Sequence, residues 1–119
     1  MWLMTKHGFY SIVRKKSGEF HVRSRERHDL ESLLQRVPLP GVEIQTSSAT
    51  DYSHRIIVGR EMVLKILQFL GETLDYGNFK EMIHENPDQS QKTTAYGEIW
   101  KVMFEEFGGY GKAGRQRTR

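Results

Sequence analysis

The first half of the chain places apolar and polar residues in the pattern of β-strands. Residues 9–14 are rich in aromatic and β-branched side chains, and residues 20–25 alternate, with Phe20 and Val22 on one face and His21, Arg23 and Arg25 on the other. The Lys-Lys-Ser-Gly segment between them ends at Gly18 and is typical of a tight turn. These two segments therefore predict a β-hairpin.

Apolar residues at helical spacing follow the hairpin. The order of two strands and then a helix occurs a second time further along the chain. The first helical stripe ends at Pro38, because proline stops a helix. Residues 42–46 and 55–58 predict two further strands, and a longer amphipathic helix begins after Gly59. The two helical stripes consist of Leu30, Leu33, Leu34 and Val37, and of Val63, Ile66, Leu67, Leu70 and Leu74.

The last third of the chain has a helical pattern throughout. Residues 78–85 predict a short helix, and residues 93–107 predict a longer one that ends at Gly108. The longer helix has the strongest apolar periodicity in the chain. Its stripe consists of Tyr96, Ile99, Trp100, Met103, Phe104 and Phe107.

Together these elements predict an α+β fold. We expect an antiparallel four-stranded sheet made of two hairpin–helix units, with helices on one face and further helices at the C-terminal end. A ferredoxin-like order also fits if residues 2–5 supply a strand. We expect one α+β domain over residues 1–108 and a flexible basic tail over residues 109–119, where no apolar periodicity remains.

The composition excludes several classes of protein. The chain has 119 residues and no cysteine, so disulfides and thiolate metal sites are excluded. No stretch approaches the ~20 consecutive apolar residues of a membrane helix, and the N-terminal residues lack the pattern of a signal peptide. We therefore expect a cytoplasmic protein with no membrane partner. The five histidines follow no metal-site spacing, so we also expect no metal and no cofactor.

Charge is segregated along the chain. The net charge of +3 combines +5 over residues 1–27, −6 over residues 28–107 and +4 over residues 108–119. The chain therefore has two basic ends and an acidic middle. This segregation is stronger evidence for an anionic partner than the small net charge alone.

Positive charge also collects on one face of the predicted hairpin. The two-residue period of a strand places Arg23 and Arg25 on the face opposite Phe20 and Val22, so we expect them on the sheet face that the helices leave open. Guanidinium groups bind phosphate oxygens in pairs, and Phe9 or Tyr10 would offer rings for base stacking. The alternative is a solvated face whose arginines pair with acidic residues across strands. Those residues are Glu19, Glu26 and Glu43.

The basic tail adds to this candidate anion-binding set. Flexible basic arms bind nucleic acid by releasing counterions, without reading its sequence. The alternative is a tail that only keeps the chain soluble. The complete candidate set is Arg23, Arg25, Arg55, Lys80, Lys112, Arg115, Arg117 and Arg119.

Two further groups of residues are candidate sites. His21 and His54 would serve a phosphoester-processing enzyme, with Asp51, if they met across neighbouring strands. A recurring Asp-Tyr dipeptide suggests a polar pocket, although aspartate in such places often only forms a turn. No phosphate-binding loop or nucleophile-elbow motif occurs, so catalysis is the less favoured hypothesis. The pocket residues would be Asp51, Tyr52, Asp75, Tyr76 and Asn78.

Five motifs together resemble a widespread family of small, uncharacterised bacterial proteins of similar length. They are Met-Trp-x-x-Thr-x-x-Gly-Phe-x-Ser-x-Val (1–13), Val-Arg-x-Arg-x-x-x-Asp-Leu-Glu-x-Leu (22–33), Thr-Asp-Tyr-x-x-Arg (50–55), Asp-Tyr-x-Asn-Phe-Lys (75–80) and Tyr-x-x-x-Trp (96–100). The resemblance covers residues 1–104 and leaves out the basic tail. It implies a common fold, and it draws attention to the polar residues that the motifs contain.

The function expected from these patterns is a non-enzymatic binding module for an anionic partner, either nucleic acid or a nucleotide. A protein-interaction component, such as an inhibitor or an accessory subunit of a larger complex, is the alternative. A phosphoester-processing enzyme is the third hypothesis.

Overall fold

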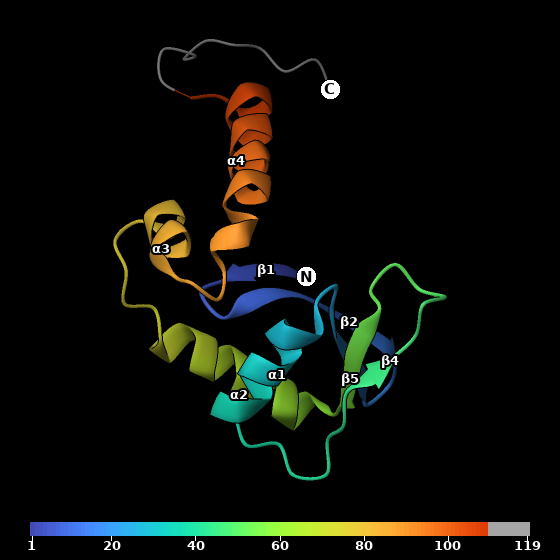
Figure 1. The fold of residues 1–119 in the computed structure, drawn as a ribbon. Coiled ribbons are helices and arrows are strands. Elements are labelled where there is room, and N and C mark those ends of the chain that lie inside the picture. The colour runs from blue at the N-terminus through green and yellow to red at the C-terminus, as the bar shows by residue number, and fades with distance from the viewer. Residues whose placement is uncertain (110–119) are drawn as a thin grey trace. The chain divides into compact units, whose positions relative to one another are not determined.

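The computed structural model describes residues 1–109 of the chain (Figure 1). It has two compact units, the first over Met1–Gly77 and the second from Asn78 onward. The first unit contains the sheet and two helices, and the second contains the remaining helices. Apart from Gly109, the predicted tail lies outside the described residues.

A five-stranded antiparallel sheet forms the centre of the first unit. Its spatial order is β1-β2-β3-β5-β4. The predicted α+β class and antiparallel sheet are confirmed, and the N-terminal segment adds a fifth strand. Three strands precede the first helix, so the order differs from the ferredoxin-like alternative. The strands are β1 (Trp2–Thr5), β2 (Gly8–Lys16), β3 (Glu19–Ser24), β4 (Gln45–Thr46) and β5 (His54–Val58).

Two helices, α1 (Arg27–Arg36) and α2 (Arg60–Glu72), cover one face of this sheet (Figure 1). Ile12, Val22 and Ile56 lie opposite one another on β2, β3 and β5, so they point to the same face. All three are buried in one cluster with most of the predicted helical stripes, whereas Leu74 lies beyond the end of α2 and is largely exposed. Each such side chain contributes about 2 kcal/mol through burial. The prediction of helices on one face is confirmed.

The predicted strand over residues 42–46 is much shorter in the structure. Only its last two residues pair with β5. Gly41 adopts a φ of 75°, and the Val42 amide donates to the Leu39 carbonyl at 3.3 Å, so this part of the chain forms a turn. Val42 and Ile44 still pack against the core, which explains their apolar pattern.

The turn between β1 and β2 is held by a threonine and by close contact with α1. Thr5 Oγ1 accepts hydrogen bonds from the amides of His7 and Gly8, both at 3.1 Å. Asp29, which is buried in α1, accepts from the Phe9 amide at 3.1 Å. A Cβ on Gly8 would lie 2.6 Å from the Asp29 Cβ. Only glycine allows this close approach.

The second unit contains α3 (Phe79–Glu85), the 3-10 turn η1 (Ser90–Lys92) and α4 (Thr93–Phe107). Asn78 caps α3, because its side chain accepts from the Glu81 amide at 2.9 Å. The rings of Phe79 and Tyr96 lie 5.5 Å apart and join α3 to α4. Within residues 1–109, no helix combines the length and apolar character needed to cross a membrane.

Candidate anion-binding face

Five side chains from all five strands form one row on the sheet face that α1 and α2 do not cover. Trp2 lies opposite Ser11, Ser11 opposite Arg23, Arg23 opposite Arg55, and Arg55 opposite Gln45. Directly opposed residues of antiparallel strands point to the same face. With strands about 4.8 Å apart, the row is about 19 Å long. We call this surface the arginine face.

Arg23 lies in the middle of the row and is held by two contacts. Its Nη2 donates to Ser11 Oγ at 2.7 Å, and Ser11 is buried beneath it. Its guanidinium carbon lies 4.5 Å from the centre of the Tyr52 ring. The Nε atom of Arg23 is buried without a hydrogen-bond partner. Arg23 is therefore preorganised while part of its donor capacity remains unused.

Tyr52 brings Arg23 and Arg25 together. The Arg25 guanidinium carbon lies 4.2 Å from the centre of the same ring, and Tyr52 is only 3 % exposed. Asp51 accepts from the Tyr52 amide at 2.9 Å, and the Thr50 hydroxyl donates to the Tyr52 carbonyl at 2.8 Å. The negative faces of an aromatic ring attract guanidinium groups, so Tyr52 offsets part of the repulsion between the two arginines.

Arg55 is oriented by a chain of hydrogen bonds that ends at a carboxylate. Its Nη1 donates to His21 Nδ1 at 3.0 Å, which leaves the proton of His21 on Nε2. That nitrogen donates to Glu19 at 3.0 Å. The hydrogen bond from His21 holds the pKa of Glu19 below its usual value, with a smaller contribution from the charge of Lys16.

None of the three arginines forms an ion pair with a carboxylate of the described chain. Glu19, one of the acidic partners that the alternative interpretation required, contacts Lys16 and His21 instead. Arg25 is exposed, and Arg23 and Arg55 are half-buried. Three positive charges therefore lie on one surface without carboxylates to neutralise them.

The aromatic residues of the arginine face differ in part from those expected. Tyr10 is completely buried on the helix-covered side, where its hydroxyl donates to the Asp29 carbonyl at 2.7 Å, so it is unable to stack on a base. Phe9 does lie on the arginine face, 6.4 Å from the ring of Trp2. Trp2 itself is 74 % exposed. Sequence reasoning missed Trp2, and the available signal was the possible strand over residues 2–5.

His21 and His54 do not meet across neighbouring strands, as the phosphoester-enzyme hypothesis required. His21 lies opposite Ile57, whereas His54 lies opposite Ser24. Ile57 and His54 are three residues apart on one strand, so the two histidines point to opposite faces of the sheet. His54 instead contacts Thr46 Oγ1 at 3.1 Å. No group of histidine and carboxylate side chains suited to a metal ion occurs among residues 1–109.

The expected polar-pocket residues lie in separate surroundings. Asp51 and Tyr52 belong to the loop beside the arginine face. Asp75 pairs with Lys6 at 2.9 Å near the β1–β2 turn, where Tyr76 lines an apolar pocket. Asn78 is the cap of α3 in the second unit.

Lys80, the remaining candidate cation among residues 1–109, is not part of this row. Lys80 belongs to the second unit, where its ammonium lies 4.3 Å from the centre of the Trp100 ring. The four tail residues lie outside the described residues. They are Lys112, Arg115, Arg117 and Arg119.

The fold and the site define a small α+β protein with a cationic and aromatic sheet surface. No family model, curated relative or solved structure matches the chain. Its function is therefore inferred from the geometry of the arginine face.

Proposed function

We propose that this chain is a non-enzymatic binding module for an anionic partner, most simply a single strand of nucleic acid or a nucleotide. The observation that carries the proposal is the row in which Arg23 and Arg55 lie between the exposed Trp2 and the edge of the sheet. Within residues 1–109, no carboxylate forms an ion pair with either arginine. Guanidinium groups supply phosphate contacts, and an exposed indole supplies a stacking surface. The lack of cysteine is compatible with a cytoplasmic location.

The length of the row favours a strand over one isolated phosphate group. The row extends for about 19 Å, because it crosses all five strands. Successive phosphates of one DNA strand are separated by about 3.4 Å along a duplex axis, and single strands bind by combining a basic track with aromatic rings. A nucleotide would occupy only the part of the row beside Tyr52.

The electrostatic part of the proposal is tested with Arg25→Ala. Binding of a fluorescein-labelled single-stranded oligonucleotide is followed by anisotropy between 20 and 200 mM NaCl, roughly the range over which phosphate contacts weaken. We expect a loss of about fivefold to tenfold and a salt slope smaller by about 0.7, which corresponds to one phosphate contact.

The matched control for this variant is Arg14→Ala. Arg14 is also an exposed arginine on the sheet, but it lies opposite Phe20 and so shares the parity of the core face. The Arg14→Ala substitution changes the net charge by the same amount as Arg25→Ala and leaves the row intact. Equal losses for Arg14→Ala and Arg25→Ala would refute a localised site, and so would the absence of any anisotropy change at low salt.

The stacking part of the proposal is tested with Trp2→Ala. We expect binding to weaken by at least about fivefold with an unchanged salt slope, because base stacking contributes about 1–3 kcal/mol per base and involves no counterions. Trp100→Ala is the control, because Trp100 is a half-exposed tryptophan of the second unit. A Trp2→Ala protein that binds as tightly as the original would remove Trp2 from the site.

Deletion of residues 110–119 measures the contribution of the tail. We expect a lower affinity for every oligonucleotide sequence and a smaller salt slope, because the deletion removes four basic residues. An unchanged slope would assign all phosphate contacts to residues outside the tail.

A protein partner is the second candidate, because Trp2, Met4 and Ile57 are exposed on the same face. Exposed apolar side chains of this kind are common in protein interfaces. Under this alternative, a co-purifying partner remains bound after nuclease treatment. Under the leading proposal, nuclease releases the bound material, and the 260 nm absorbance of the purified protein falls.

A further inference from the structure

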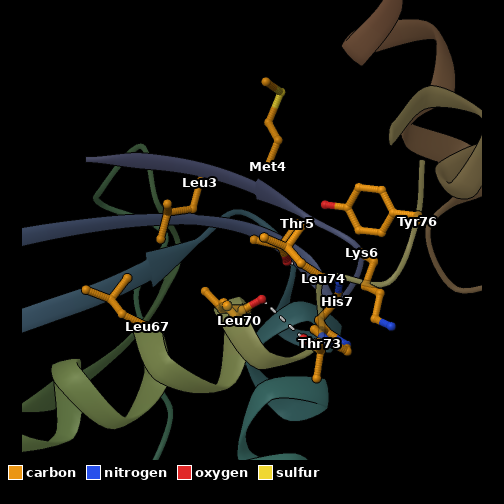
Figure 2. A pocket seen from close by; sticks show the side chains of 11 residues that line it. Leu3, Met4, Thr5, Lys6, His7, Leu67, Leu70, Thr73, Leu74 and Tyr76 are labelled. Atoms are coloured by element: carbon orange, nitrogen blue, oxygen red, sulfur yellow. Dashed lines mark hydrogen bonds between the residues drawn. The ribbon is translucent and has the colours of Figure 1, made fainter. Parts of the chain in front are cut away.

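The first unit contains an apolar pocket that is separate from the arginine row. It has a volume of about 260 Å³ and lies between the end of β1 and the C-terminal half of α2 (Figure 2). Leu3, Leu67, Leu70 and Leu74 form much of its wall. Leu74 is 63 % exposed, although leucine normally loses contact with water in a folded protein. The wall therefore offers apolar surface that the chain itself does not cover.

Polar groups occur at one end of this pocket, and two of them, Thr73 and His7, already form a hydrogen bond with each other. The hydroxyl of Thr73 donates to the Phe69 carbonyl at 2.9 Å, so its oxygen accepts from Nε2 of His7 at 3.2 Å. Burial is the main reason that the pKa of His7 is lowered to about 4, and the charge of Arg36 lowers it further. His7 is therefore uncharged at neutral pH.

Among the described residues that line the pocket, Lys6 is the one charged side chain at neutral pH. Its side chain is only 22 % exposed, and its ammonium points away from the leucines (Figure 2). This ammonium forms an ion pair with the Asp75 carboxylate at 2.9 Å, and the Asp75 side chain is 69 % exposed. Because Asp75 is largely exposed to water, this ion pair is weak, and another carboxylate can replace Asp75 at little cost.

We propose that this pocket binds a small apolar monocarboxylate, whose chain lies against the leucine wall and whose carboxylate pairs with Lys6. The charge complementarity follows from the lining, in which an apolar wall ends at a single cation. A methylene occupies about the volume of one water molecule, roughly 30 Å³, so the pocket holds a chain of about eight carbons. Octanoate is therefore the probe of choice.

A series of unbranched carboxylates tests the fit of the chain. Titration by calorimetry, with the methyl signals of Leu3 and Leu70 followed by NMR, compares butanoate, hexanoate, octanoate and dodecanoate. We expect affinity to rise about fourfold per methylene up to octanoate and then to level off, because further carbons remain outside the wall. A continued rise to dodecanoate, or shifts that spare these methyl groups, would indicate surface adsorption and overturn the proposal.

Two variants test the role of Lys6. Lys6→Met should abolish the preference for octanoate over octanol while octanol still binds, which shows that the pocket remains folded. Asp75→Asn should raise octanoate affinity by up to about fivefold, because it removes the competing carboxylate. Lys65→Met is the control, because Lys65 is an exposed lysine of α2 outside the pocket. Octylamine that binds as well as octanoate, or a loss equal in Lys65→Met and Lys6→Met, would refute the assignment.

Discussion

The lowered pKa of His7 makes the stability of the first unit depend on pH in a defined direction. His7 is 9 % exposed, contacts the Phe69 ring with centres 4.9 Å apart, and donates to Thr73. Its burial, followed by the positive charges of Arg36 and Lys6, lowers its pKa from 6.5 to about 4. Protonation therefore occurs more readily in the unfolded chain than in the folded one.

The sign and the size of the effect follow from this difference. Above pH 6.5, His7 is neutral in both states and costs nothing. As the pH falls from 6.5 to about 4, the unfolded chain gains a proton that the folded chain does not, so the free energy of unfolding decreases. The full pKa difference corresponds to about 3 kcal/mol. Solvent screening at the rim of the pocket reduces this to about 2 kcal/mol.

The assay compares the original protein with His7→Gln, whose side-chain amide can still donate to Thr73. Urea unfolding is followed by tryptophan fluorescence at several values from pH 7.5 to pH 4. Subtracting the two curves cancels the titration of the carboxylates, which both proteins share. We expect the original protein to lose about 2 kcal/mol more than the variant over this range.

Two results would contradict the reasoning. Parallel stability curves for both proteins would mean that His7 titrates equally in the folded and unfolded states. A larger loss in His7→Gln would mean that the folded state favours the protonated ring. Direct NMR titration of the His7 imidazole distinguishes these two results from the expected one, for which the midpoint lies near pH 4.

Three further predictions concern the packing around β2. Gly8→Ala should lower the free energy of unfolding in urea by about 2–3 kcal/mol, because the added Cβ would overlap Asp29 of α1. The control Gly71→Ala has open space around its Cβ and should be neutral or slightly stabilising. Equal effects of the two substitutions would refute the contact between Gly8 and Asp29. Tyr10→Phe should cost about 1–2 kcal/mol in the same assay, because a buried carbonyl loses its donor, and a neutral result would mean that water replaces the hydroxyl. Ser11→Ala should weaken oligonucleotide binding about twofold to threefold, because Arg23 loses its acceptor, and unchanged binding would show that the Tyr52 ring orients Arg23 alone.

Much of the fold could be predicted because local patterns carry it. The two-residue period of β3 correctly separated Phe20 and Val22 from Arg23, and the structure places them on opposite sides of the sheet. The spacing of apolar residues likewise located the helices to within a few residues. Such patterns depend on backbone geometry that is the same in every protein, so they can be read without a partner strand.

The strand over residues 42–46 shows where a local pattern stops being sufficient. Val42 and Ile44 are apolar and alternate, yet they pack against the core from a turn. A strand also needs a neighbour with free backbone groups, and only two residues find one on β5. The hypothesis that His21 and His54 meet failed for a similar reason. It depended on the register between two strands that are far apart in the sequence.

The sequence alone determined that this chain alternates in the manner of an antiparallel sheet, that helices cover one face, and that arginines lie on the other. Only the tertiary structure decided that Trp2 shares a row with Arg23 and Arg55, and that Tyr52 returns from a distant loop to contact two of the arginines. The physical reason is that alternation and helical spacing are local properties of the backbone. The register between strands and the path of a loop are set instead by the packing of the whole unit.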